Sequence, residues 1–258
     1  MSIDAAPKSL VEHITELRVR LLWVMGAMAI GTALSFLFVQ DLTGFLVRPL
    51  AEAMQPGDTQ RLIYTGLTEA FFTYVKVAFF SGIFLTFPVL LWQIWIFVAP
   101  GLYNKERRVF LPYLIATPVL FFLGGACVYY AVIPMAWPFF MSFQSGAEQT
   151  SLPIELEARI SEYLDLIMTL IFAFGLCFQL PVLLSLLARA GMITADTLVA
   201  TRKYAVILVF ILAAFLTPPD ILSQIMLAVP LLALYEFSIL LIRWSAFKIN
   251  TNDENTSS

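Results

Sequence analysis

Two carboxylates far apart in the sequence, Glu16 and Glu106, could together bind a ligand that carries two guanidinium groups. The planar fork of an arginine pairs with a carboxylate through two parallel hydrogen bonds, which a lysine ammonium cannot reproduce. Each carboxylate also has cations nearby, because Arg20 follows Glu16 by four residues and Lys105 and Arg107 flank Glu106. Exposed ion pairs of this kind are common and weak, so the charges alone favour local pairing over ligand binding.

Polar residues inside apolar runs offer a second kind of site. Lys76, Asp165 and Gln179 fall within long apolar stretches, where a polar or ionisable side chain usually faces protein or a wet cavity. They could line a polar groove, or form the midplane solute site of a secondary transporter. For Gln179 and Gln224, hydrogen bonds that hold helices together are an equally good explanation.

Catalysis and metal binding lack the residues they need. The sequence has a single histidine, His13, and neither a GxSxG nor a CxxC motif. Cys127 and Cys177 lie in apolar runs, where isolated cysteines usually pack as small hydrophobic residues. We therefore expect no enzyme activity, no cofactor and no metal, and the absence of a basic patch argues against nucleic acid as a partner.

The composition is that of a membrane protein. Hydrophobic residues make up 60% of the 258 residues, charged residues only 13%, and the mean hydropathy is +0.86. Soluble domains have about 45–50% apolar and about 25% charged residues. A single membrane domain, residues 1–244, is predicted, with an all-α fold and six spans at about 21–39, 69–98, 108–143, 160–190, 204–216 and 221–242.

The segments between and beside these spans differ in character. An amphipathic helix is predicted over residues 8–20, leading into the first span. A second amphipathic helix after residue 40 should be broken by Pro49. The fifth span, with some 13 residues, is shorter than the roughly 20 that a bilayer requires. The polar tail 245–258 is predicted to be disordered.

The distribution of Lys and Arg predicts the orientation of the spans. Three lie in the N-terminal segment, three in 99–108, three in 189–203 and two after the sixth span, Arg243 and Lys248, out of 15 in total. Because short cytoplasmic loops collect these residues, both termini are predicted to be cytoplasmic.

Three segments resemble signatures of one known family. Residues 13–21 (HITELRVRL), 97–103 (FVAPGLY) with 106–108 (ERR), and 216–220 (LTPPD) with Ser223 and Gln224 are similar to motifs of TatC, the receptor subunit of the twin-arginine protein translocase. The motifs occur in the family's order, and the resemblance extends over nearly the whole chain.

The resemblance implies a concave, glove-like fold of six helices with short fifth and sixth helices. It implies a receptor that binds signal peptides with consecutive arginines through Glu16 and Glu106, supported by Arg18, Phe97, Pro100, Leu102 and Tyr103. On the outer face it points to Pro49, Asp220 and Gln224. Gln179 stands where some members have a glutamate, so a role that needs charge there is in doubt.

The resemblance also implies partners and a location. The family works in a multimeric complex with single-span subunits of the TatA and TatB type. It lies in the bacterial inner membrane and exports folded proteins at the expense of the proton-motive force.

Overall fold

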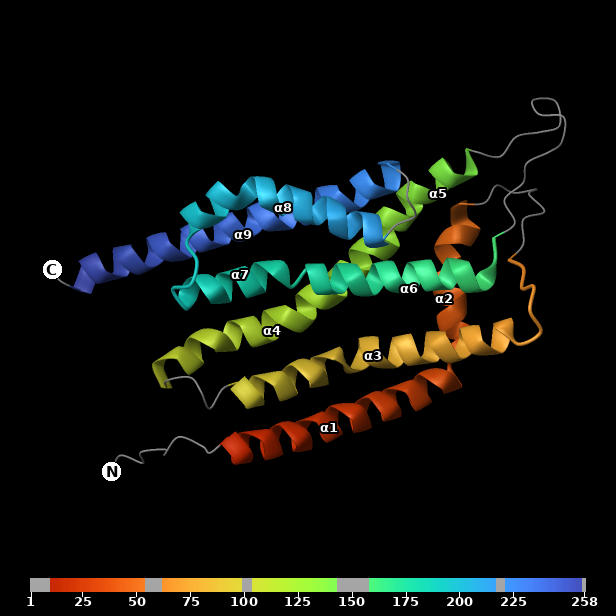
Figure 1. Cartoon of the computed structure of the whole chain (residues 1–258), viewed down its shortest axis with the longest axis horizontal. Coiled ribbons are helices and arrows are strands. Elements are labelled where there is room, and N and C mark those ends of the chain that lie inside the picture. The colour runs from red at the N-terminus through yellow and green to blue at the C-terminus, as the bar shows by residue number, and fades with distance from the viewer. Residues whose placement is uncertain (1–9, 54–61, 99–103, 143–157, 217–220, 257–258) are drawn as a thin grey trace. The chain divides into compact units, whose positions relative to one another are not determined.

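The structure is a computed structural model that describes residues 10–53, 62–98, 104–142, 158–216 and 221–256 (Figure 1). These residues are almost entirely helical, which confirms the predicted all-α class. In chain order the elements are α1 (Leu10–Leu37), α2 (Val39–Ala53), α3 (Glu69–Val98), α4 (Asn104–Cys127), the π-helix η2 (Val128–Val132), α5 (Ile133–Met141), α6 (Ile160–Cys177), α7 (Leu180–Arg189), α8 (Ala195–Leu216) and α9 (Ile221–Thr256).

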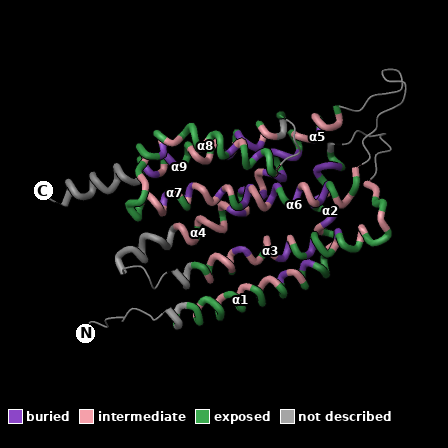
Figure 2. The backbone as a smooth tube through the Cα atoms, viewed as in Figure 1, coloured by how far each residue is buried: buried purple, intermediate pink, exposed green. Residues whose placement is uncertain are grey.

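Among the described residues, six stretches are long and apolar enough to cross a membrane, as predicted. They are α1, α3, the continuous run α4–η2–α5, the pair α6–α7, α8, and the first part of α9. Figure 2 shows buried residues concentrated along α6, whereas α1 and α8 are mostly exposed. Apolar side chains exposed over a whole helix are what a lipid environment requires.

The chain groups into two compact units. The first contains the chain through Phe45 together with Phe71–Pro118, and the second contains Leu46–Ala70 and the chain from Val119 onward. All of α1, the start of α2, most of α3 and α4 up to Pro118 therefore belong to one unit, and the rest of the chain belongs to the other.

In the first unit, α1 and α3 approach each other at small residues. A Cβ added to Gly82 would lie 2.5 Å from the backbone nitrogen of Thr32, and one added to Gly31 would lie 3.0 Å from the Gly82 carbonyl oxygen. Such contacts leave no room for a side chain between the two backbones, which is the usual packing of close helix pairs in membranes.

The second unit has a similar close contact between α4 and α6. A Cβ on Gly124 would lie 2.6 Å from the Phe174 carbonyl oxygen, and one on Gly175 would lie 2.6 Å from the Phe121 ring. Phe121 and Phe174 are both fully buried. The π-helix η2 follows directly after this contact and buries Val128 and Tyr129.

The fourth span is two helices rather than one. Helix α6 ends at Cys177, the Gln179 amide donates to the Leu176 carbonyl at 2.9 Å, and α7 begins at Leu180. Pro181 occupies one of the first two positions of α7, where its missing amide hydrogen costs nothing. The proline therefore ends one helix and begins another.

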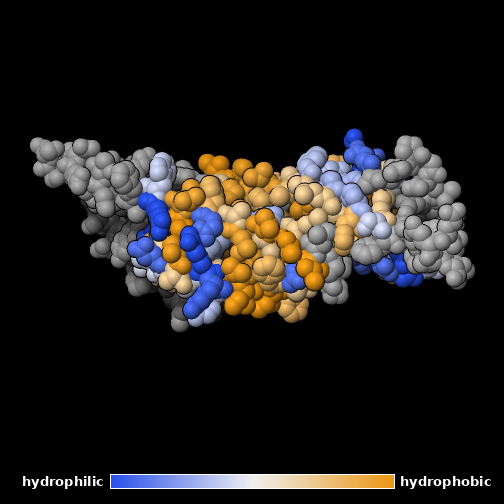
Figure 3. Space-filling model, turned by 90° about the horizontal axis from the view of Figure 1, so that it is seen from above, coloured by the Kyte–Doolittle hydropathy of each residue, from blue (hydrophilic) through white to orange (hydrophobic). Residues whose placement is uncertain are grey.

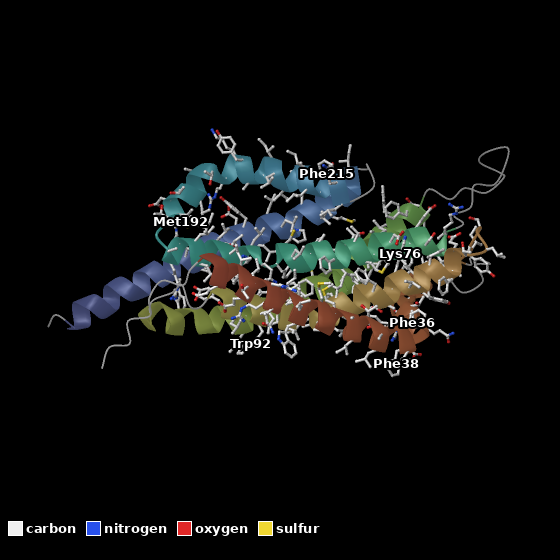
Figure 4. All side chains as sticks on the ribbon, turned by 60° about the horizontal axis from the view of Figure 1, so that its bottom comes forward. Phe36, Phe38, Lys76, Trp92, Met192 and Phe215 are labelled. Carbon is white, nitrogen blue, oxygen red and sulfur yellow. The ribbon has the colours of Figure 1, made fainter. Side chains whose placement is uncertain are left out.

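The turn after α7 connects to α8 through paired capping motifs. Gly191, with φ 72°, closes α7 while the Met192 amide donates to the Leu187 carbonyl at 3.0 Å, a pattern that glycine permits. Thr194 then accepts a hydrogen bond from the Thr197 amide at 3.2 Å and so caps α8. Met192 lies at this turn (Figure 4).

The fifth span begins earlier than the sequence predicts. Helix α8 begins at Ala195, not near residue 204, and has 22 residues, so the predicted length of some 13 residues is wrong. The last two spans, with 22 and 21 residues, are still the shortest of the six in the described residues. The polar start of α8 is helical because Leu198 packs with Ile239 and Ile242 of α9 in a buried cluster. Arg202 of α8 also pairs with Glu236 of α9 at 2.6 Å.

Two further differences concern helix ends. The structure continues α9 to Thr256, where the sequence predicts a disordered tail from residue 245. Pro49 does not break α2, which runs through it to Ala53. Leu46 and Leu50 on either side of the proline are buried, and this packing offsets the one backbone hydrogen bond that proline removes.

A buried hydroxyl braces α2 at the turn that contains Pro49. The Tyr163 hydroxyl of α6 donates to the Leu46 carbonyl at 2.9 Å, and its ring stacks on Trp137 of α5 with centroids 5.3 Å apart. Tyr163 is only 3% exposed, so water cannot replace this donor.

We expect Tyr163→Phe to lower the free energy of unfolding by about 1 kcal/mol, because the substitution removes one buried hydrogen bond and keeps the ring. Thermal unfolding in detergent micelles measures the change. Tyr130→Phe is the matched control, since Tyr130 is 71% exposed. Equal stability of the two variants would contradict the bracing role.

Candidate functional site

Helices α1 and α4 begin at the same end of the first unit. Helices α1 and α3 run in opposite directions (Figure 1) and touch at Gly31 and Gly82. Glu16 lies 15 residues before Gly31, and Val98 lies 16 residues after Gly82, which is about 22 and 24 Å along the two helices. Glu16 is therefore level with the end of α3, and α4 begins only six residues after Val98.

Glu16 lies on α1 in an ion pair with Arg20, whose Nη2 donates to Glu16 Oε1. The two side chains are only 20% and 16% exposed. Arg18 is exposed, as is Glu12 one turn before Glu16. The local pairing that the charges favour is thus present at Glu16.

Glu106 lies in the first turn of α4, where the helix dipole stabilises a carboxylate. Phe97 lies in the last turn of α3. The side chains of these two residues, and all of Pro100, Leu102 and Tyr103, lie outside the described part of the structure. The backbone brings Glu16 and Glu106 to the same end of one unit, which the sequence motif alone could not establish.

The proposed midplane residues do not form one site. Asp165 and Gln179 are both half-buried, but they lie 14 residues apart along the fourth span, or about 21 Å. Gln179 Nε2 donates to the Gly175 carbonyl at 3.2 Å. Lys76 belongs to the first unit and is exposed on α3 (Figure 4). The secondary-transporter interpretation is not supported.

The outer-face residues inferred from the resemblance lie on separate elements of the second unit. Pro49 is inside α2, next to the Tyr163 contact. Gln224, in the second turn of α9, donates to the Phe210 carbonyl of α8 at 2.9 Å. Asp220 lies outside the described residues. Gln224 therefore joins α8 to α9, as a helix-joining hydrogen bond should.

Sequence reasoning missed a cluster at the start of α3. The Glu69 carboxylate accepts hydrogen bonds from the Thr65 and Gly66 amides at 2.8 and 3.0 Å and from the Ser161 hydroxyl at 2.6 Å. The position of Glu69 in the first helical turn was readable from the sequence, but its contact with α6, 92 residues away, was not.

The same cluster contains a second set of contacts. Ile63 and Arg159 form a parallel bridge, and Arg159 bonds to Thr65 and pairs with Glu162 at 3.0 Å. The hydrogen bond with Glu162 raises the pKa of Arg159, which therefore stays charged at any physiological pH. These contacts tie the segment before α3 to the start of α6.

Within the described ranges, no three His, Cys, Asp or Glu side chains come together in a way that could hold a metal ion. Cys127 and Cys177 are free thiols.

Six apolar helical stretches in the described residues define a multi-pass membrane protein. The family model for Sec-independent protein translocase protein (TatC) matches residues 12–230. The chain belongs to the TatC family, which makes it an inner-membrane component of a protein translocase.

Relatives support this assignment over nearly the full length. The chain is 48% identical to the TatC protein of Magnetococcus marinus, over 93% of this chain and 86% of the relative. It is 45% identical to the TatC protein of Rickettsia prowazekii, over 90% and 92%. A crystal structure of a twin-arginine translocase receptor, TatC, superposes with a TM-score of 0.77 at 32% identity, covering 91% of this chain and 99% of that one.

Proposed function

We propose that this protein is the receptor that binds signal peptides with two consecutive arginines at the cytoplasmic end of the first unit. Glu16 and Glu106 each accept one guanidinium, and Arg18, Phe97, Pro100, Leu102 and Tyr103 shape the surrounding surface. The observation that carries the proposal is the placement of Glu16 and the first turn of α4 at one end of a single unit.

The charge distribution supports the orientation. Eleven of the 15 Lys and Arg residues lie in the N-terminal segment, in 99–108, in 189–203 and after residue 242. The positive-inside rule assigns these segments, and with them both termini, to the cytoplasm. An exported peptide would then meet the two carboxylates before it enters the membrane.

The last two spans offer a surface for single-span partners of the TatA and TatB type. Helix α8 exposes Ile207, Leu208, Ile211 and Phe215 along its length, and Figure 3 shows a continuous apolar surface on the face to which α8 contributes. Gln224 lies in the second turn of α9, and Asp220 directly precedes α9 in the sequence. We propose that the assembled complex exports folded proteins with the proton-motive force.

The central test is binding of a fluorescent signal peptide to the full-length protein in lipid nanodiscs. We expect an Arg-Arg peptide to bind about tenfold or more tightly than the same peptide with Gln-Gln, because hydrogen bonds to charged groups contribute about 1.5–3 kcal/mol. Equal affinities for the two peptides would contradict the proposal.

A further inference from the structure

The ion pair at Glu16 is unlike the other ion pairs of the described residues. In Arg20–Glu16 the side chains are 16% and 20% exposed, whereas in Arg48–Glu52 they are 70% and 64% exposed. Three further pairs, Arg159–Glu162, Arg202–Glu236 and Arg243–Asp196, have side chains at least 44% exposed on both sides. The Glu16 carboxylate is thus already occupied by a guanidinium in a partly desolvated setting, where ion pairs are stronger than on an open surface.

Arg20 itself is incompletely satisfied. Its Nε is buried and has no hydrogen-bond partner among the described residues, while its Nη2 donates to Glu16. A buried donor without a partner costs free energy. The resident pair therefore holds the Glu16 carboxylate with a guanidinium that is itself poorly solvated.

We infer that Arg20 is a resident competitor for the peptide arginine at Glu16 and thereby sets the affinity and the guanidinium selectivity of the site. This inference rests on the proposed function. A peptide guanidinium binds Glu16 Oε1 by displacing Arg20, whose long side chain can then extend to water at the membrane surface.

Competition by a guanidinium also explains selectivity against lysine. An ammonium is a compact and strongly hydrated charge, and it pairs with a carboxylate in a less defined geometry than a guanidinium does. A lysine must therefore lose more hydration to displace Arg20, and gains less at Glu16. Without Arg20, the site should still bind both cations but should distinguish between them less.

Peptide binding to the full-length protein in nanodiscs tests the inference. Arg20→Gln keeps a polar side chain and removes the guanidinium, and we expect it to bind an Arg-Arg peptide about fivefold more tightly. The increase in affinity for a Lys-Lys peptide should be larger. The variant should therefore prefer the Arg-Arg peptide over the Lys-Lys peptide by a smaller factor than the parent protein does. In a protein that already carries Glu16→Gln, the further substitution Arg20→Gln should not change the peptide affinity.

Lys203→Gln is the matched control for net charge, because it removes one exposed cation from α8, in the second unit. It should leave the affinity for either peptide unchanged. If Glu16→Gln weakens binding but Arg20→Gln leaves it equal or weaker, the competitor role is overturned and the proposed function stands. If Glu16→Gln leaves binding unchanged, the proposed function itself fails, and this inference with it.

Discussion

Glu106→Gln will weaken binding of an Arg-Arg signal peptide about tenfold to hundredfold, because each charged hydrogen bond to a guanidinium contributes about 1.5–3 kcal/mol. Glutamine keeps the size of the side chain and part of its hydrogen-bonding capacity, so the loss reports the charge. Glu16→Gln will act in the same direction but less strongly, since Arg20 already occupies the Glu16 carboxylate. Nanodisc binding measures the affinity, and export of a folded reporter in cells measures the consequence.

Glu12→Gln is the control for these two substitutions. Glu12 is an exposed carboxylate one helical turn before Glu16 on α1, so its neutralisation changes the local charge by the same amount. We expect at most a twofold change in peptide affinity, as for an exposed charge screened by salt. If Glu12→Gln weakens peptide binding as much as Glu106→Gln does, binding depends only on the overall charge at this end of the unit.

Gly124→Ala will lower the stability of the second unit by about 1–3 kcal/mol, the usual cost of forcing an extra carbon into a packed interior. The new methyl would lie 2.6 Å from the Phe174 carbonyl oxygen and 2.9 Å from Gly175 Cα. Both are backbone atoms, so relief requires α4 and α6 to separate. A lower midpoint of thermal unfolding in detergent is the expected observation.

Gly26→Ala gives the opposite expectation. A Cβ at Gly26 of α1 meets nothing within 4 Å, and alanine favours the helix over glycine by about 1 kcal/mol. This variant should be as stable as the parent or slightly more stable. If both alanine variants change stability equally, the close contact between α4 and α6 does not govern the packing of this unit.

The sequence predicts the helices well where hydropathy reports them, and less well where packing decides. Six spans follow from apolar runs of about 20 residues, and all six are found. The length of α8 was missed because hydropathy detects the part of a helix that can lie in lipid, not its polar extension. Residues from Ala195 to Lys203 read as a loop, yet Thr194 caps them and Leu198 packs against Ile239.

Proline was informative in one place and misleading in another. Pro181 stands just after the break that divides the fourth span into α6 and α7, as a residue without an amide hydrogen should. Pro49 was predicted to end a helix, but α2 continues through it because Leu46 and Leu50 are buried. The π-helix η2 has no sequence signal that we can identify.

For the site, the sequence named the residues, and the structure adds their surroundings. The i,i+4 spacing of Glu16 and Arg20 indicated a possible pair, but only coordinates show that the pair is largely covered. Contacts such as Glu69 with Ser161 join residues far apart in the chain, and no periodicity in one sequence predicts them.

A double-mutant cycle between the peptide and the protein tests the central claim most directly. The affinities of the Arg-Arg peptide and of a variant with one arginine changed to glutamine are measured against the parent protein and Glu106→Gln. The account predicts a coupling free energy of about 1–3 kcal/mol, so that losing the arginine costs little once Glu106 is neutral. If the losses in affinity from the peptide and protein substitutions are fully additive, whichever arginine is changed and whether it is combined with Glu106→Gln or Glu16→Gln, the claim is contradicted.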